Sequence, residues 1–138
     1  SLDLAEALKM TIEKFQRQTQ IPVNFVQQGQ GHLRSAEQQL QIVFILQEAL
    51  SNIRKHAHAQ QVTVTLSNDH DLALTITDDG IGFDLNQVAS EKEGHVGLNI
   101  MRERAARLGG MLTFDAQQGK GTRLKLTIAN ISPATALA

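Results

Sequence analysis

The sequence contains no cysteine, tryptophan or tyrosine, and five phenylalanines supply its only benzene rings. Without cysteine, neither a disulfide framework nor thiolate chemistry is available to this chain. So few rings argue against an aromatic platform that stacks single-stranded nucleic acid or glycans. The formal net charge of −1 also lacks the basic excess of nucleic-acid-binding domains, so we expect no nucleic acid as a partner.

Long apolar runs are absent as well. No segment approaches the roughly 18 apolar residues that a membrane-spanning helix needs, and no signal peptide is visible at the start. We therefore expect no membrane contact by this chain. Its 138 residues are about the modal size of one domain. Because it begins with Ser1 rather than methionine, we interpret it as part of a longer protein.

Hydrophobic periodicity predicts three helices and five strands. Apolar residues recur at helical spacing in three segments, which are 1–20, 35–58 and 96–108. Apolar and polar residues alternate in the segments predicted as strands, which are 21–27, 61–67, 72–77, 111–116 and 122–129. The polar stretch from Asp78 to Gly94 has little periodicity, which predicts a long loop of the kind that is usually functional.

This order of elements predicts the α+β class. Consecutive strands that pair as hairpins need no crossover, so the helices have to cover one face of the sheet. We expect a two-layer α/β sandwich with a mixed, mostly antiparallel sheet of about five strands, covered on one face by three helices. A doubly wound nucleotide fold is excluded because strands and helices do not alternate.

Four polar side chains recur along the second predicted helix. Glu48 is followed by Asn52, Lys55 and His56 at offsets of four, seven and eight residues, which places all four on one face about 100° wide. The opposite side is apolar and consists of Ile42, Leu46, Ala49, Leu50, Ile53 and Ala57. The apolar stripe docks the helix. The polar edge is either a solvated face or one wall of a site.

Three glycine-bearing motifs follow. The run Asp78–Gly82 (DDGIG) leaves a predicted strand, and its glycines either allow close approach to a flat ligand or form an ordinary turn. The run Gly94–Leu98 (GHVGL) precedes a predicted helix, whose start is either an anion site or a plain helix start with a solvated basic face. In GKGT, Thr122 either closes a tight hairpin or offers its hydroxyl to a phosphate.

The order of these motifs is more specific than any one of them. E-x-x-x-N-x-x-K-H, D-x-G-x-G, G-x-x-G-L and G-x-G-T succeed one another along the chain. This arrangement resembles the ATP-binding domain of sensor histidine kinases, a Bergerat-type ATP-binding fold that gyrase, a heat-shock chaperone and a mismatch-repair ATPase share. The run GHVGLNIMRERAARLGG is similar to the branch containing the nitrate/nitrite sensors and the membrane-fluidity sensor. The resemblance covers about residues 20–129.

The resemblance implies roles for the polar helix face. Asn52 would ligate Mg²⁺ through its side-chain oxygen, and Glu48 would orient or deprotonate the accepting imidazole. Lys55 would contact phosphate, and His56 would line the site. One amide oxygen together with phosphates suits Mg²⁺, which prefers oxygen ligands and keeps several waters.

The glycine motifs supply the other contacts with ATP that the resemblance implies. Asp78 would accept a hydrogen bond from the adenine amino group, whereas guanine would present a carbonyl there. Asp79 stands where the family often has Asn, at a variable position. The remaining contacts are Gly80, Ile81 and Gly82 beside the base, Gly94, Gly97 and Leu98 at the lid end near the phosphates, and Thr122.

The resemblance also implies partners. A histidine kinase presents its phosphoacceptor histidine in an acidic H-box, and none of His32, His56, His58, His70 and His95 has that context. We expect the acceptor on a separate dimerisation segment, with relay to a response regulator, in the cytoplasmic part of a membrane-anchored parent. The alternatives are an anti-sigma-factor-like serine kinase of the same fold and a non-catalytic ATP-sensing module.

The expected domain organisation follows from the same resemblance. Residues 20–130 would form the ATP-binding domain, and residues 131–138 would be a tail. Residues 1–19 would form a helix that either continues from the dimerisation segment or begins this domain; the sequence does not separate the two.

Overall fold

The computed structural model describes residues 3–29, 31–81, 92–116 and 120–129. These residues form the elements α1 (Leu4–Thr19), β1 (Val23–Gln28), α2 (Ala36–Asn52), the π-helix η1 (Ile53–Ala57), β2 (Val62–Asn68), β3 (Leu72–Asp78), α4 (Lys92–Arg107), β4 (Met111–Ala116) and β5 (Thr122–Ile128). The order of helices and strands is the predicted one. Among the helices described, none combines the length and apolar character that a membrane crossing requires.

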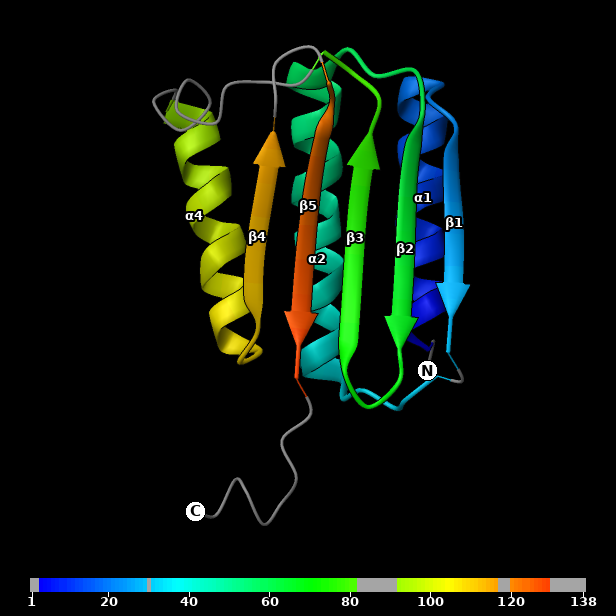
Figure 1. Cartoon of the computed structure of the whole chain (residues 1–138), viewed down its shortest axis with the longest axis vertical. Coiled ribbons are helices and arrows are strands. Elements are labelled where there is room, and N and C mark those ends of the chain that lie inside the picture. Colours follow the sequence, from blue (N-terminus) through cyan, green and yellow to red (C-terminus); the bar gives the residue numbers. More distant parts are fainter. Residues whose placement is uncertain (1–2, 30, 82–91, 117–119, 130–138) are drawn as a thin grey trace.

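The five strands form one sheet in the order β1-β2-β3-β5-β4. β1 runs parallel to β2, and every other neighbouring pair is antiparallel. In the view of Figure 1, α1 and α2 lie behind the sheet and α4 lies beside β4. All three α-helices contribute buried side chains to one core cluster with the strands, so they cover a single face. This confirms the predicted α+β two-layer sandwich with its mixed, mostly antiparallel sheet.

Alternation along the strands explains why helices cover only one face. In β2 and β3 every second side chain is buried, beginning with Val62 and Leu72. The inward side chains join one core cluster with the predicted stripes of the helices, which include Leu8 of α1 and Leu46 of α2, both 0% exposed. Burying a leucine stabilises the fold by roughly 1.5–3 kcal/mol. The core therefore holds α1 against the same sheet as α2.

Capping side chains stand at the starts of α1 and α2. The Asp3 carboxylate accepts a hydrogen bond from the backbone N–H of Glu6 at 2.8 Å. At the start of α2, Ser35 and Gln38 form a reciprocal capping box, with two hydrogen bonds of 3.1 Å. Such side chains satisfy N–H groups that lack a partner in the first turn.

One predicted boundary is wrong, and one predicted helix changes type. The second helix ends at Ala57, as predicted, but it is α-helical only to Asn52 and continues from there as the π-helix η1. A single wide turn of this kind carries no sequence signature of its own. The third helix begins at Lys92 rather than near Val96, so the run GHVGL lies inside α4. A glycine costs a helix about 1 kcal/mol, and packing of an amphipathic face outweighs that cost.

The topology gathers the predicted motifs at one end of the molecule. β3 and β5 are antiparallel, and Asp78 at the end of β3 pairs with Thr122 at the start of β5. α2 runs toward this end and α4 runs away from it, as the upper part of Figure 1 shows. Segments that lie far apart in the sequence therefore meet there.

Candidate functional site

The Asp78 carboxylate lies at the centre of this end of the sheet. Its side chain is 4% exposed, and its Oδ1 accepts a hydrogen bond from the N–H of Gly80 at 2.8 Å. Its Oδ2 accepts a hydrogen bond from the hydroxyl of Thr122. A carboxylate offers about four acceptor positions, so capacity remains for a further donor. The structure thus brings together three residues that the sequence predicted separately.

Two glycines allow the backbone to close around Asp78. A Cβ at Gly80 would overlap the carbonyl of Ala57, whose carbon it would approach to 2.8 Å. The same carbonyl accepts a hydrogen bond from the N–H of Ile81 at 2.8 Å, which fixes the motif on the end of η1. Gly121 has φ +81°, and a Cβ there would collide with the backbone of Asp78. Gly121 belongs to the predicted motif G-x-G-T but not to the predicted ATP contacts, although its place directly before Thr122 in a tight turn is a usable signal.

The exposed Asp79 side chain binds backbone on the opposite side of the strand from Asp78. Its Oδ1 accepts hydrogen bonds from the backbone N–H groups of Gln60 and Gln61, both at 2.9 Å. These bonds, the one from Gln61 first, hold the pKa of the Asp79 carboxyl below its ordinary value. Asp79 therefore joins the end of β3 to the start of β2.

Glu48, Asn52 and Gly97 form a second group, between α2 and α4. Asn52 is 6% exposed, and its Nδ2 has no hydrogen-bond partner among the described residues. A Cβ at Gly97 would lie 3.2 Å from Oε2 of Glu48 and 4.0 Å from Oδ1 of Asn52. The solvated-face interpretation is therefore wrong for Asn52. Gly97 lies within the helix and lets α4 approach the Glu48 carboxylate closely.

The other residues that were predicted to contact ATP differ in their exposure and location. On η1, Lys55 is exposed and His56 is half-buried, and the wide turn breaks the 100° spacing from which their shared face with Glu48 was predicted. Ile81 is 52% exposed, and Leu98 is buried in the core. Two further predicted contacts are glycines: Gly94 is in the first turn of α4, and Gly82 lies outside the described residues.

A small cavity connects the two groups. Asn52 and Thr122 both line it, and the other lining residues are Ala49, Ile53, Ile76, Phe114 and Leu124. Its volume of about 10 Å³ is close to that of a single water, so the described residues alone enclose far less space than a purine needs. The cavity nevertheless places an amide, a hydroxyl and apolar walls around one point beside Asp78.

The side chains at this end suit a cation that is coordinated mainly by phosphates and waters and only partly by the protein. Within the described ranges, no group of three or more His, Cys, Asp or Glu side chains could hold a metal ion. The buried Asn52 side chain offers one amide oxygen next to the Glu48 carboxylate, which matches the partial oxygen shell that Mg²⁺ takes from a protein when phosphates and waters complete it. The orphaned Nδ2 of Asn52 is a hydrogen-bond donor and is not a metal ligand.

Residues 37–130 match the family described as histidine kinase-, DNA gyrase B-, and HSP90-like ATPase. The chain belongs to this family. Among curated relatives, it is 37% identical over 127 residues to the nitrate/nitrite sensor protein NarQ of Escherichia coli, covering 91% of this chain and 22% of that protein. It is 34% identical over 126 residues to the sensor histidine kinase LiaS of Bacillus subtilis, covering 91% and 34%. The chain thus spans about a third or less of these relatives.

Solved structures show the same fold. The histidine kinase domain of the blue-light activated histidine kinase from Erythrobacter litoralis superimposes with a TM-score of 0.75 at 21% identity. The match covers 94% of this chain and 62% of that one.

Proposed function

We propose that this chain is the catalytic ATP-binding domain of a sensor histidine kinase and binds Mg-ATP at the end of the sheet where β3 and β5 meet. The observation that carries the proposal is the buried Asp78 carboxylate, which keeps acceptor positions open beside the cavity lined by Asn52 and Thr122. Family membership and the relatives named as sensors support it.

Asp78 selects the base in this proposal. The adenine amino group donates to the carboxylate, whereas guanine would place a carbonyl against it, acceptor facing acceptor. A buried hydrogen bond that is not made costs about 1–3 kcal/mol, which is roughly 5- to 150-fold in affinity. Gly80 and Gly82 bring backbone against the base, with Ile81 beside it, and Thr122 holds Asp78 in place.

The phosphates lie toward α2 and α4 in this proposal. Asn52 would hold Mg²⁺ through its side-chain oxygen, and the bound ion would supply charge neutralisation for the phosphates. The exposed ammonium of Lys55 contacts phosphate, and the half-buried His56 lines the site. Gly94 belongs to the first turn of α4, where N–H groups without helical partners favour an anion.

The acceptor is a histidine on a separate dimerisation segment of the parent. Its imidazole nitrogen bonds to the γ-phosphorus as the bond from that phosphorus to the β,γ-bridging oxygen breaks, and ADP leaves. The imidazole proton passes to Glu48 or to solvent. The phosphoryl group then passes to a response-regulator aspartate. We place the parent at a membrane with this domain facing the cytoplasm, residues 20–130 as its ATP-binding part and residues 131–138 as a tail.

Incubation with γ-labelled ATP and Mg²⁺ tests the reaction. The chain alone is expected to acquire no acid-labile label, because none of its histidines has an H-box context. Addition of a dimerisation segment with an H-box is expected to give acid-labile label on that segment. Asn52→Ala is expected to abolish the transfer while the fold is retained.

Each other outcome contradicts a defined part of the proposal. Acid-stable label on serine of an added partner would indicate a serine kinase. Retained ATP binding without transfer to any supplied H-box segment would indicate an ATP-sensing module. Acid-labile label on this chain alone would overturn the separate acceptor, and near-normal transfer by Asn52→Ala would remove Asn52 from the metal.

A further inference from the structure

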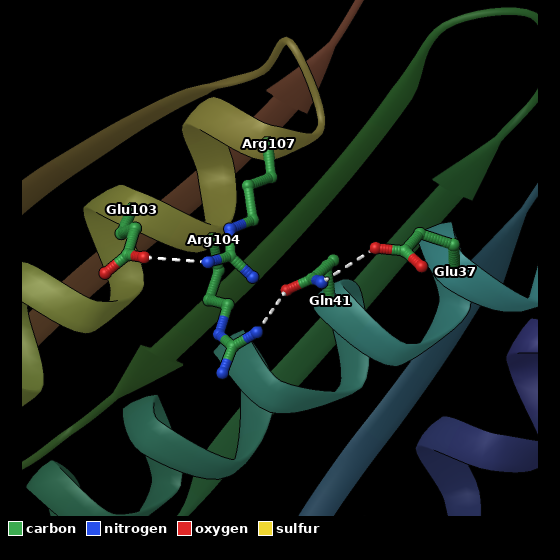
Figure 2. A network of polar contacts seen from close by, with 5 residues as sticks. All are labelled: Glu37, Gln41, Glu103, Arg104 and Arg107. Atoms are coloured by element: carbon green, nitrogen blue, oxygen red, sulfur yellow. Dashed lines mark hydrogen bonds and ion pairs between the residues drawn. The ribbon is translucent and has the colours of Figure 1, made fainter.

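A buried amide lies at the lower end of the interface between α2 and α4. Gln41 is 3% exposed although it carries a polar side chain. Its Nε2 donates to the Glu37 carboxylate at 3.4 Å, and its Oε1 accepts from Nη1 of Arg104 at 3.1 Å, as Figure 2 shows. Because the carboxylate accepts from one end of the amide, the oxygen end is left facing α4.

A second contact fixes the same guanidinium. Its central carbon lies 4.5 Å from the ring centre of Phe44, one turn farther along α2. Guanidinium groups favour this position over an aromatic face. Arg104 is therefore held in two directions by α2, whereas the neighbouring Arg107 makes an exposed ion pair of 2.9 Å with Glu103 on its own helix.

The part of the α2–α4 interface that separates these two contacts from the candidate site is apolar. Gln41 and Glu48 are seven residues apart on α2, and Arg104 and Gly97 are seven apart on α4, so the two ends lie about 10 Å from each other on both helices. Met101, which lies between them on α4, is fully buried. Apolar seams fix the register of two helices weakly, whereas a single buried polar residue fixes it strongly.

We propose that the contact between Gln41 and Arg104 sets the register of α4 on α2 and thereby positions Gly97 against the Glu48 carboxylate. Gln41 and Arg104 are positioning residues, since neither touches the site. A slip of α4 by one turn would move Gly97 about 5.4 Å away from Glu48 and leave the buried amide of Gln41 without its donor. The consequence for catalysis rests on the proposed function, whereas the register itself does not.

Backbone amide exchange without nucleotide tests the register directly. Arg104→Met keeps an apolar stem but removes the hydrogen bond and the contact with Phe44. Exchange at residues 97–101 is expected to quicken about tenfold, the factor for one hydrogen bond to a charged group, while β2 and β3 stay unchanged. Arg107→Met removes the same charge three residues away and is expected to leave all of these amides unchanged.

A double-mutant cycle assigns the effect to the pair. Gln41→Leu fits the buried position and is expected to act like Arg104→Met, and the double variant is expected to add nothing further. It also tests the same contact if Arg104→Met fails to fold. In a Mg-ATP titration, both single variants are expected to bind about five- to tenfold more weakly.

Three results would overturn the proposal. Equal exchange in Arg104→Met and Arg107→Met would show that the contact fixes nothing. Faster exchange in every element would show a general stabilising role, and additive effects would show that the two residues act independently. If the unmodified chain binds no ATP, the proposed function fails while the exchange experiment still decides the register.

Discussion

Two successive aspartates at the end of β3 have opposite environments. Asp78 points into the core layer, where its carboxylate accepts from Gly80 and Thr122 and keeps acceptor capacity for a ligand. Asp79 points outward and accepts from two backbone N–H groups at the start of β2. Alternation along a strand therefore separates a binding residue from a structural one with the same side chain.

The lowered pKa of Asp79 predicts a pH dependence of stability. Because its folded pKa lies below the value of about 3.9 in unfolded chains, its charge stabilises the fold above pH 4, and this contribution is lost as pH falls through the folded pKa. Asp79→Asn keeps an acceptor oxygen without the charge. We expect its Tm to be lower than that of the unmodified chain at pH 6–8, by no more than about 4 °C because the site is exposed.

Calorimetric melts between pH 3 and pH 8 measure this difference. The gap in Tm should be constant above pH 5 and should close below pH 4. A gap that persists unchanged to pH 3 would show that the charge of Asp79 does not stabilise the fold.

At the residue scale, the sequence predicts the side chains that cluster better than it predicts backbone contacts. The structure brings together Asp78, Gly80 and Thr122, which the sequence motifs indicate as site residues. The carbonyl of Ala57, which accepts from Ile81 and excludes a side chain at Gly80, was not predictable because a backbone acceptor has no residue-type signature. The prediction that Lys55 shares a helix face with Glu48 assumes α-helical spacing throughout. That spacing ends at Asn52, so the prediction does not hold for Lys55.

Among the elements, α4 carries Gly97 over the Glu48 carboxylate. A Cβ there would lie 3.2 Å from a carboxylate oxygen at the end of a flexible side chain, so the side chain has to shift. The helix itself gains from alanine, by roughly 1 kcal/mol over glycine. Stability and function are therefore expected to respond differently to the same substitution.

Gly97→Ala tests this separation. We expect the free energy of unfolding to remain within about 1 kcal/mol of the unmodified chain, because the gain in helix propensity offsets the displaced carboxylate. We expect the rate of transfer to a supplied H-box segment to fall about tenfold, since the Glu48 carboxylate has to shift by a few tenths of an ångström and catalysis depends on its position. Urea titration measures the first quantity and labelled ATP the second. Unchanged transfer would separate Gly97 from the function of Glu48.

Regular elements were predictable where one face is buried. The alternation of β2 and β3 and the apolar stripe of α2 both gave correct predictions. The π-turn and the early start of α4 were not predictable, since neither has a sequence signature of its own and the start of α4 contains a glycine, which local preference disfavours in a helix.

At the scale of the whole molecule, the two ends of the sheet carry different groups of polar residues. The candidate site occupies the end where β3 stops and β5 starts, and the hairpin between β2 and β3 lies at the other. There Arg34 donates to the side chain of Asn68 at 3.1 Å and to the backbone carbonyls of Asp69 and His70 at 2.9 and 3.1 Å. These bonds tie the segment before α2 to the hairpin.

Arg34→Met is expected to separate stability from binding. Loss of bonds from a charged, half-buried group should lower the free energy of unfolding by about 1–2 kcal/mol. The affinity for Mg-ATP should stay within about twofold, because distant sites without shared partners act independently. Urea titration and calorimetry measure the two quantities. A large loss of ATP affinity in a folded variant would show that the two ends are coupled.

Titration of the intact chain with Mg-ATP and Mg-GTP, repeated with Asp78→Asn, tests the central claim most directly. The account predicts that the unmodified chain binds ATP and discriminates against GTP by roughly 5- to 150-fold, the range for one unmade buried hydrogen bond. It predicts that Asp78→Asn, with its fold intact by circular dichroism, loses most of the ATP affinity. Equal affinity for both nucleotides, or unchanged ATP affinity in Asp78→Asn, would contradict the assignment of Asp78 to the adenine pocket.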